Sequence, residues 1–87
     1  MALFLIERNW AEQLEVTPDS AAAVKQINDD VGVRWLYSFL TGDKKKTYCL
    51  YEAISADAIR EAAERADIPA DVIVEVDQLK PEMFAAS

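Results

Sequence analysis

The segment VRWLYSFLTGDKKKTYCLYEA, from Val33 to Ala53, decides the fold of this chain. Two runs rich in aromatic and aliphatic residues flank a turn with a Gly-Asp pair and three lysines. This pattern predicts a β-hairpin with strands at Val33–Leu40 and Thr47–Ala53 and a loop at Thr41–Lys45. Both faces of the hairpin are apolar, and a short chain can hardly cover both faces by itself.

The size and charge of the chain narrow the possible functions. With 87 residues it forms one domain, and a domain of this size buries only roughly 60–65% of its unfolded surface. The net charge of −7 argues against nucleic-acid binding, because a phosphate-binding face must be basic. The only basic run is Lys44-Lys45-Lys46, at the predicted turn. Solvated lysines that protect a strand edge explain this run more simply than a phosphate site.

The composition also bears on location and cofactors. No segment approaches the roughly 20 apolar residues of a membrane helix, and the N-terminal run lacks the leader and cleavage site of a signal peptide. The lone Cys49 cannot form an internal disulfide, which suits a reducing compartment. We therefore expect a cytoplasmic protein without membrane contacts. The chain has no histidine, the commonest metal ligand, so we expect neither a metal site nor a cofactor.

Helix signals lie on both sides of the hairpin. Thr17 and Pro18 are typical of the N-cap and first position of a helix, and Gly32 of its end. Ser55 is expected to cap a second helix that runs to about Ala66 and stops before Pro69. The predicted inward stripe of the first helix is Ala22, Ala23, Val24, Ile27 and Val31.

Further strands are predicted at Leu3–Arg8 and Val72–Val76. The order is then βαββαβ, which with right-handed crossovers gives a ferredoxin-like α+β fold: a four-stranded antiparallel sheet with two helices on one face. We expect this domain to span residues 1–78, with a C-terminal tail at residues 79–87.

Side chains alternate along each strand, so each strand contributes two sets. The set expected beneath the helices is Phe4, Ile6, Val33, Trp35, Tyr37, Phe39, Cys49, Tyr51, Ala53, Val72, Val74 and Val76. The second set is Leu3, Leu5, Glu7, Arg34, Leu36, Ser38, Leu40, Tyr48, Leu50, Glu52, Ile73 and Glu75. This second set has too many large aliphatic residues for a solvated surface. We expect a second copy of the chain to cover it, face to face.

The hairpin loop also predicts a register. A loop at Thr41–Lys45 places Arg34 opposite Glu52, so that the two side chains form a cross-strand ion pair. The pair is either structural or part of a ligand site, and structural pairing is the simpler reading. The further predicted pairs are Leu36 with Leu50 and Ser38 with Tyr48.

Several segments resemble one small bacterial family of unknown function. They are LFLIER near the start, KTYCLYEA, the capped helix SADAIREAAERADIP and the final ADVIVEVD. The family includes a nickel-binding ferredoxin-like protein, and its members resemble the dimeric α+β barrels. The resemblance implies the fold and a dimer. It does not carry nickel binding over, because the family's nickel binding depends on histidine ligands and this chain has none.

A cavity between two paired sheets would be lined by the polar and apolar residues of the second set. The expected ligand-binding residues are Leu5, Glu7, Trp10, Arg34, Leu36, Ser38, Tyr48, Leu50, Glu52 and Glu75. Trp10 is either a lid over the ligand or an interface anchor. Tyr48 is either a proton donor or a ring packed at the interface, with Glu7 and Glu52 as further acid–base candidates. Cys49, beneath the helices and without a histidine to activate it, is expected to be inert.

Three functions fit these expectations. The first is a homodimeric ligand-binding or accessory domain that holds a small, partly apolar molecule between its sheets. The second is a cofactor-free enzyme of the monooxygenase or isomerase type that uses the same cavity, an idea that rests on fold analogy. The third is a structural or assembly module. The sequence leaves open whether the protein is an enzyme.

Overall fold

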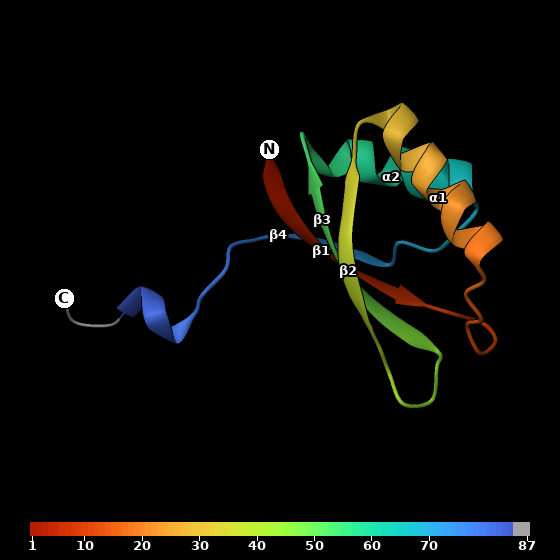
Figure 1. The fold of residues 1–87 in the computed structure, drawn as a ribbon, viewed down its shortest axis with the longest axis horizontal. Helices are drawn as coiled ribbons and strands as arrows, with labels where there is room; N and C mark the ends of the chain where they lie inside the picture. The colour runs from red at the N-terminus through yellow and green to blue at the C-terminus, as the bar shows by residue number, and fades with distance from the viewer. Residues whose placement is uncertain (85–87) are drawn as a thin grey trace.

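The computed structural model describes residues 1–84 and has the predicted order of elements (Figure 1). The elements are β1 (Ala2–Asn9), α1 (Pro18–Val31), β2 (Arg34–Leu40), β3 (Lys46–Ala53), α2 (Ala56–Ala66), β4 (Val72–Val76) and a short 3₁₀ helix, η1 (Pro81–Phe84). The four strands form one antiparallel sheet in the order β2-β3-β1-β4. The predicted ferredoxin-like α+β fold is confirmed.

The ends of α1 follow the predicted signals. The Thr17 side chain accepts a hydrogen bond from the backbone N–H of Ser20 at 3.1 Å, and the Ser20 hydroxyl oxygen accepts one from the Thr17 N–H at 3.0 Å. These two bonds form a capping box, which satisfies N–H groups that have no partner inside the helix. Gly32 ends the helix at a φ of 82°, a left-handed conformation that glycine adopts without a Cβ clash.

The inward face of α1 differs from the predicted stripe. Ala22 and Ala23 are exposed, whereas Ala21 lies partly buried and Asn28 is buried. Alanine side chains are too small to fix the rotation of a helix, so the larger Val24, Ile27 and Val31 decide which side faces the sheet. In α2, Ile59, Ala62 and Ala63 are buried, and Ser55 caps the helix as predicted.

Both helices pack on one face of the sheet, which we call the covered face. No helix among residues 1–84 covers the other face, which we call the open face (Figure 1). The core lies between the helices and the covered face. Its buried residues are Phe4, Ile6, Val33, Cys49, Tyr51, Ala53, Ile59 and Ala62. Among residues 1–84, no helix is long and apolar enough to span a membrane.

The predicted faces of β4 are wrong. Ile6 pairs with Ile73 and Leu5 with Val74, so Ile73 lies on the covered face and packs against the core. Val72, Val74 and Val76 lie on the open face, and Glu75 has the parity of the covered face. In the sequence VIVEV both alternating sets can be buried, so only the pairing with β1 decides the face.

A β-bulge in β2 changes the predicted hairpin register. Arg34 lies opposite Glu52 as predicted, but the register shifts between Trp35 and Tyr37. From there on Ser38 lies opposite Cys49 instead of Tyr48, and Leu50 faces Tyr37 instead of Leu36. An extra residue in one strand reverses the faces of every residue that follows it.

The bulge therefore exchanges two pairs of side chains. Tyr37 and Phe39, predicted beneath the helices, lie on the open face with Leu50 and Tyr48, and their rings meet edge to face at 5.7 Å. Ser38 and Leu40, predicted on the second face, share the covered face with Cys49 and Thr47. A hydrogen bond from the Trp35 indole to the Ser38 hydroxyl, 2.8 Å long, spans the bulge and stabilises this arrangement.

The chain beyond β4 extends away from the sheet and ends in η1 (Figure 1). Its apolar side chains Leu79, Met83 and Phe84 are exposed. We call residues 79–84 the C-terminal arm. Residues 85–87 of the predicted tail lie outside the described part of the chain.

Candidate functional site

The open face is more apolar than the sequence predicted, because the bulge and the register of β4 add aromatic and branched residues to it. Tyr37 is 50% exposed and Phe39 is 64% exposed, so both rings are more exposed than aromatic rings in folded proteins usually are. The apolar residues of this face are Leu3, Leu5, Tyr37, Phe39, Tyr48, Leu50, Val72, Val74 and Val76. Exposed apolar side chains gathered on one face are a common feature of interaction sites.

The charged residues of the open face form two pairs. Arg34 Nη1 lies 3.5 Å from Glu52 Oε1, which confirms the predicted ion pair. Lys46 Nζ lies 3.8 Å from Glu7 Oε2 and 5.9 Å from the centre of the Tyr48 ring. Each carboxylate on this face thus has a cationic neighbour within the same chain.

The structure brings most of the predicted ligand-binding residues together on the open face. Leu5, Glu7, Tyr48, Leu50, Glu52 and Arg34 lie there, on β1, β3 and β2. Leu36, at the bulge, lines a surface hollow with Glu52 and Glu75 at one end of the sheet. The role of these residues in ligand binding stays a prediction.

Three predicted site residues lie elsewhere. Glu75 has the parity of the covered face, because it pairs with Phe4. Ser38 is on the covered face because of the bulge, and Trp10 also turns to that side of the sheet. The Trp10 indole donates a hydrogen bond to the Thr47 hydroxyl at 3.1 Å, and its backbone N–H donates one to the Lys45 carbonyl. Trp10 therefore does not form a lid over the open face.

A cavity of about 260 Å³ lies between α1, the Trp10–Thr17 loop and the covered face. Trp10, Trp35 and Ser38 line it, together with the buried Thr47 and Cys49. We call it the helix-side cavity. Most of its wall is apolar, with a few polar groups in fixed positions, which is the usual character of a small-molecule site.

Arg8 also lines the helix-side cavity, and the sequence analysis did not single it out. It is only 2% exposed, an unusual state for a charged residue. The signal was available: Arg8 follows Phe4 and Ile6 at intervals of two and thus belongs to the covered face. Its guanidinium donates a hydrogen bond to the Pro69 carbonyl and lies 5.7 Å from the centre of the Tyr51 ring.

Burial raises the pKa of the Tyr51 phenol above its ordinary value of 10.0, and the nearby positive charge of Arg8 opposes that shift only in part. Tyr51 is therefore a neutral phenol at physiological pH. It supplies a polarisable ring beside Arg8 but no negative charge.

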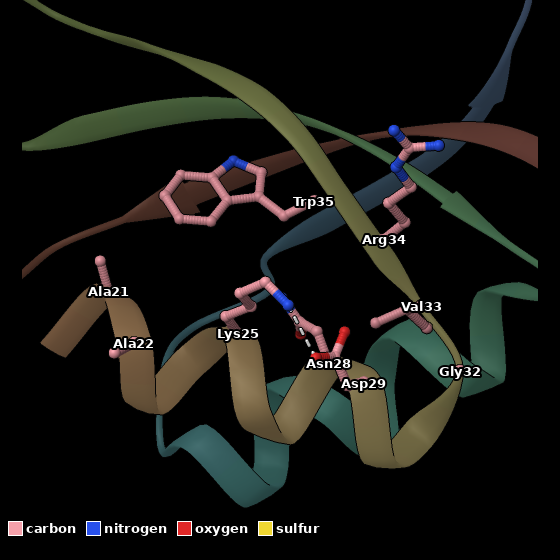
Figure 2. A pocket seen from close by; sticks show the side chains of 9 residues that line it. All are labelled: Ala21, Ala22, Lys25, Asn28, Asp29, Gly32, Val33, Arg34 and Trp35. Carbon is pink, nitrogen blue, oxygen red and sulfur yellow. Dashed lines mark hydrogen bonds and ion pairs between the residues drawn. The ribbon is translucent and has the colours of Figure 1, made fainter.

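A second, larger hollow of about 690 Å³ runs along the outer side of α1 against β2 (Figure 2). Lys25 and Asp29 of α1 form an ion pair of 2.8 Å on its wall, and Trp35 extends toward it from β2. Asn28, which is 4% exposed, also lines it, and its Nδ2 has no hydrogen-bond partner within the described residues. Trp35 and Ala21 line both this hollow and the helix-side cavity.

Comparison with known proteins identifies the family to which the chain is similar. The family model described as "Nickel responsive protein SCO4226-like" matches residues 4–76, which include all four strands in whole or in part and both helices. The chain belongs to the SCO4226-like family. The predicted resemblance to a nickel-associated bacterial family is thus confirmed.

A solved member has the same fold. The crystal structure of SCO4226 from Streptomyces coelicolor A3(2) is 26% identical in sequence, with a TM-score of 0.69. The match covers 91% of this chain and 100% of the other. No curated protein matches the chain.

The nickel association in the family's description does not fit the donor groups of this chain. Imidazole and thiolate are the protein ligands that suit nickel, whereas the chain has no histidine and its one cysteine is buried in the core. Within residues 1–84, no three acidic or cysteine side chains are grouped as metal ligands would be.

Proposed function

We propose that this member of the SCO4226-like family is a homodimeric small-molecule-binding domain whose two copies pair through their open faces. The observation that carries the proposal is the exposed apolar surface on the open face, to which Tyr37, Phe39, Val72 and Val74 contribute. Left in water, such a surface would be an aggregation hazard, and its burial would contribute roughly 25 cal/mol per Å².

The charge pattern favours a second copy of the chain as the occupant. The chain as a whole is acidic, but the ion pairs Arg34–Glu52 and Lys46–Glu7 leave the open face without a net charge of its own. An apolar partner surface would leave no charge unpaired there, because the charged residues already pair with each other. A strongly charged partner would find no complementary charge on this face.

The C-terminal arm supports the same arrangement. Leu79, Met83 and Phe84 are exposed on a segment that extends beyond the body of its own chain. In a face-to-face dimer, this arm could pack on the partner's body. Small domains commonly gain stability from association in this way.

A molecule held between the paired sheets would meet Tyr48 together with the Arg34–Glu52 pair. Tyr48 is partly buried beside Lys46, and its hydroxyl can donate or accept a hydrogen bond. The proposal includes a cytoplasmic location, which is supported by the single cysteine, since it cannot form an internal disulfide.

Sedimentation equilibrium tests the dimer. The wild-type chain should have about twice its monomer mass of 9.7 kDa, and Val74→Asp should weaken the association about tenfold or more, since it places a charge in an apolar interface. Ile54→Asp is the matched control, because Ile54 is exposed in the loop after β3 and outside the open face. A monomeric wild-type chain would refute the proposal.

Native mass spectrometry of the chain purified from its own host tests ligand binding. A dimer that carries a reproducible extra mass, released on denaturation, is the expected result. A dimer without added mass would instead favour a purely structural module.

A further inference from the structure

The helix-side cavity has a feature that simple core packing does not explain. Arg8 is almost wholly buried on its wall; its Nη1 donates a hydrogen bond to the Pro69 carbonyl, and its guanidinium also lies near the Tyr51 hydroxyl. No carboxylate of these residues lies within 4.0 Å of the guanidinium. A buried charge without an ionic partner is costly, so such charges normally have one.

The acidic residues closest to Arg8 in sequence and sheet are engaged elsewhere. Glu7, on the opposite face, pairs with Lys46, and the Asp71 carboxylate accepts a hydrogen bond from the Asn9 backbone N–H at 2.7 Å. The neutral Tyr51 ring offers Arg8 a cation–π contact but no countercharge. Arg8 therefore has no countercharge among residues 1–84.

Most of the remaining cavity wall is apolar. Trp10 and Trp35 contribute indole rings, and Leu14, Val24, Leu40 and Ile68 contribute aliphatic side chains. A volume of about 260 Å³ holds roughly nine groups of the size of water, at ~30 Å³ each. An inorganic anion would fill only a small part of this space and would leave the apolar wall unused.

We propose that the helix-side cavity binds a small apolar carboxylic acid, with its carboxylate on Arg8 and its hydrocarbon or aromatic part between Trp10 and Trp35. A planar guanidinium matches a carboxylate through parallel N–H···O bonds. Glu15, which also lines the cavity, is exposed to solvent, so its charge is screened and opposes the anion only weakly. This site lies on the opposite side of the sheet from the open face and does not depend on the dimer.

Two tryptophans report on the cavity directly. They are the only ones in the chain, and both line it. Their indole N–H groups donate to Thr47 and Ser38, so each should give a separate signal in a ¹H–¹⁵N correlation spectrum that responds to an occupant. Phenylacetate is a suitable probe, and phenylacetamide is its uncharged counterpart of nearly the same shape.

Titration of the full chain with phenylacetate should shift both indole signals in a saturable manner, with a Kd of about 1 mM or tighter. Phenylacetamide should bind about tenfold or more weakly, because it cannot supply the countercharge. Arg8→Met should abolish this preference for the acid, whereas Arg34→Met, the matched change on the open face, should retain it.

The acid–amide comparison on the wild-type chain decides the question even if Arg8→Met fails to fold. Equal affinity for acid and amide would overturn the proposal, as would a lack of saturable shifts up to about 10 mM phenylacetate. Shifts confined to Leu5, Tyr48 and Leu50 would also overturn it, and would place the ligand between the paired sheets instead.

Discussion

The covered and open faces of this sheet both carry many apolar residues, but their polar groups differ in burial and in the partners that they contact. On the covered face Arg8 and Thr47 are buried, and each has few partners. On the open face Arg34, Lys46 and their two carboxylate partners lie in ion pairs that water still reaches. The helices exclude water from one face only. A charge on the covered face therefore interacts more strongly with its neighbours than the same charge on the open face does.

This contrast separates residues that hold the domain together from residues that can serve a partner. A substitution on the covered face should change the stability of the single chain. In the proposed dimer, a substitution on the open face should act mainly through association. Three measurements can test this division.

The largest difference is expected between Ile6→Ala and Leu5→Ala, which are neighbours in β1 on opposite faces. Ile6 is fully buried, so its truncation leaves a cavity and should lower the free energy of unfolding by about 3 kcal/mol. Leu5→Ala should cost less than about half as much at protein concentrations that keep the chain monomeric. Urea denaturation measures both, and equal losses would contradict the division between the faces.

A second difference concerns alkaline pH. Burial holds the pKa of Tyr51 in the folded chain above its ordinary value of 10.0, which the unfolded chain regains. Below pH 10 the phenol is protonated in both the folded and the unfolded chain. As the pH rises further, the unfolded chain loses this proton first, so the folded chain should lose stability by at most about 1.4 kcal/mol per pH unit. Tyr51→Phe should make the decline less steep.

The control for Tyr51 is Tyr37→Phe on the open face, where the ring is half exposed. Denaturation at a series of pH values from 8 to about 11 should show the wild-type decline in this variant. If both variants change the slope alike, burial by the helices is not its cause.

The smallest effect is expected for Arg34→Leu. Arg34 and Glu52 lie 3.5 Å apart with side chains 75% and 32% exposed, and such a surface pair contributes less than about 1 kcal/mol. Thermal denaturation of the monomeric chain at low and high salt should show a change near the limit of detection. A larger loss would show that water does not reach this pair.

Several parts of the fold were predictable because local groups determine them. Thr17, Gly32 and Ser55 mark helix ends through hydrogen bonds or a backbone conformation that need no distant partner. The bounds of β4 and the Arg34–Glu52 pair also follow from local patterns. These features were correct because the cap, the turn and the alternation are properties of short segments.

The candidate site was harder to predict. Most of its expected residues do share the open face, but the bulge moved Ser38 away, and Trp10 turned to the covered face. One extra residue in β2 has no clear signal in a run where both alternating sets are apolar. The same ambiguity hid Tyr37 and Phe39, which the bulge moved to the open face.

The sequence by itself determined the order of strands and helices, the ends of those helices and the excess of apolar surface. Only the tertiary structure decided which face each residue of β2 and β4 occupies and where Arg8 lies. The physical reason is that alternation specifies two sets but not their phase, and the phase follows from pairing with β1 and β3 and from packing against α1 and α2. The helix-side cavity exists only in that packed arrangement.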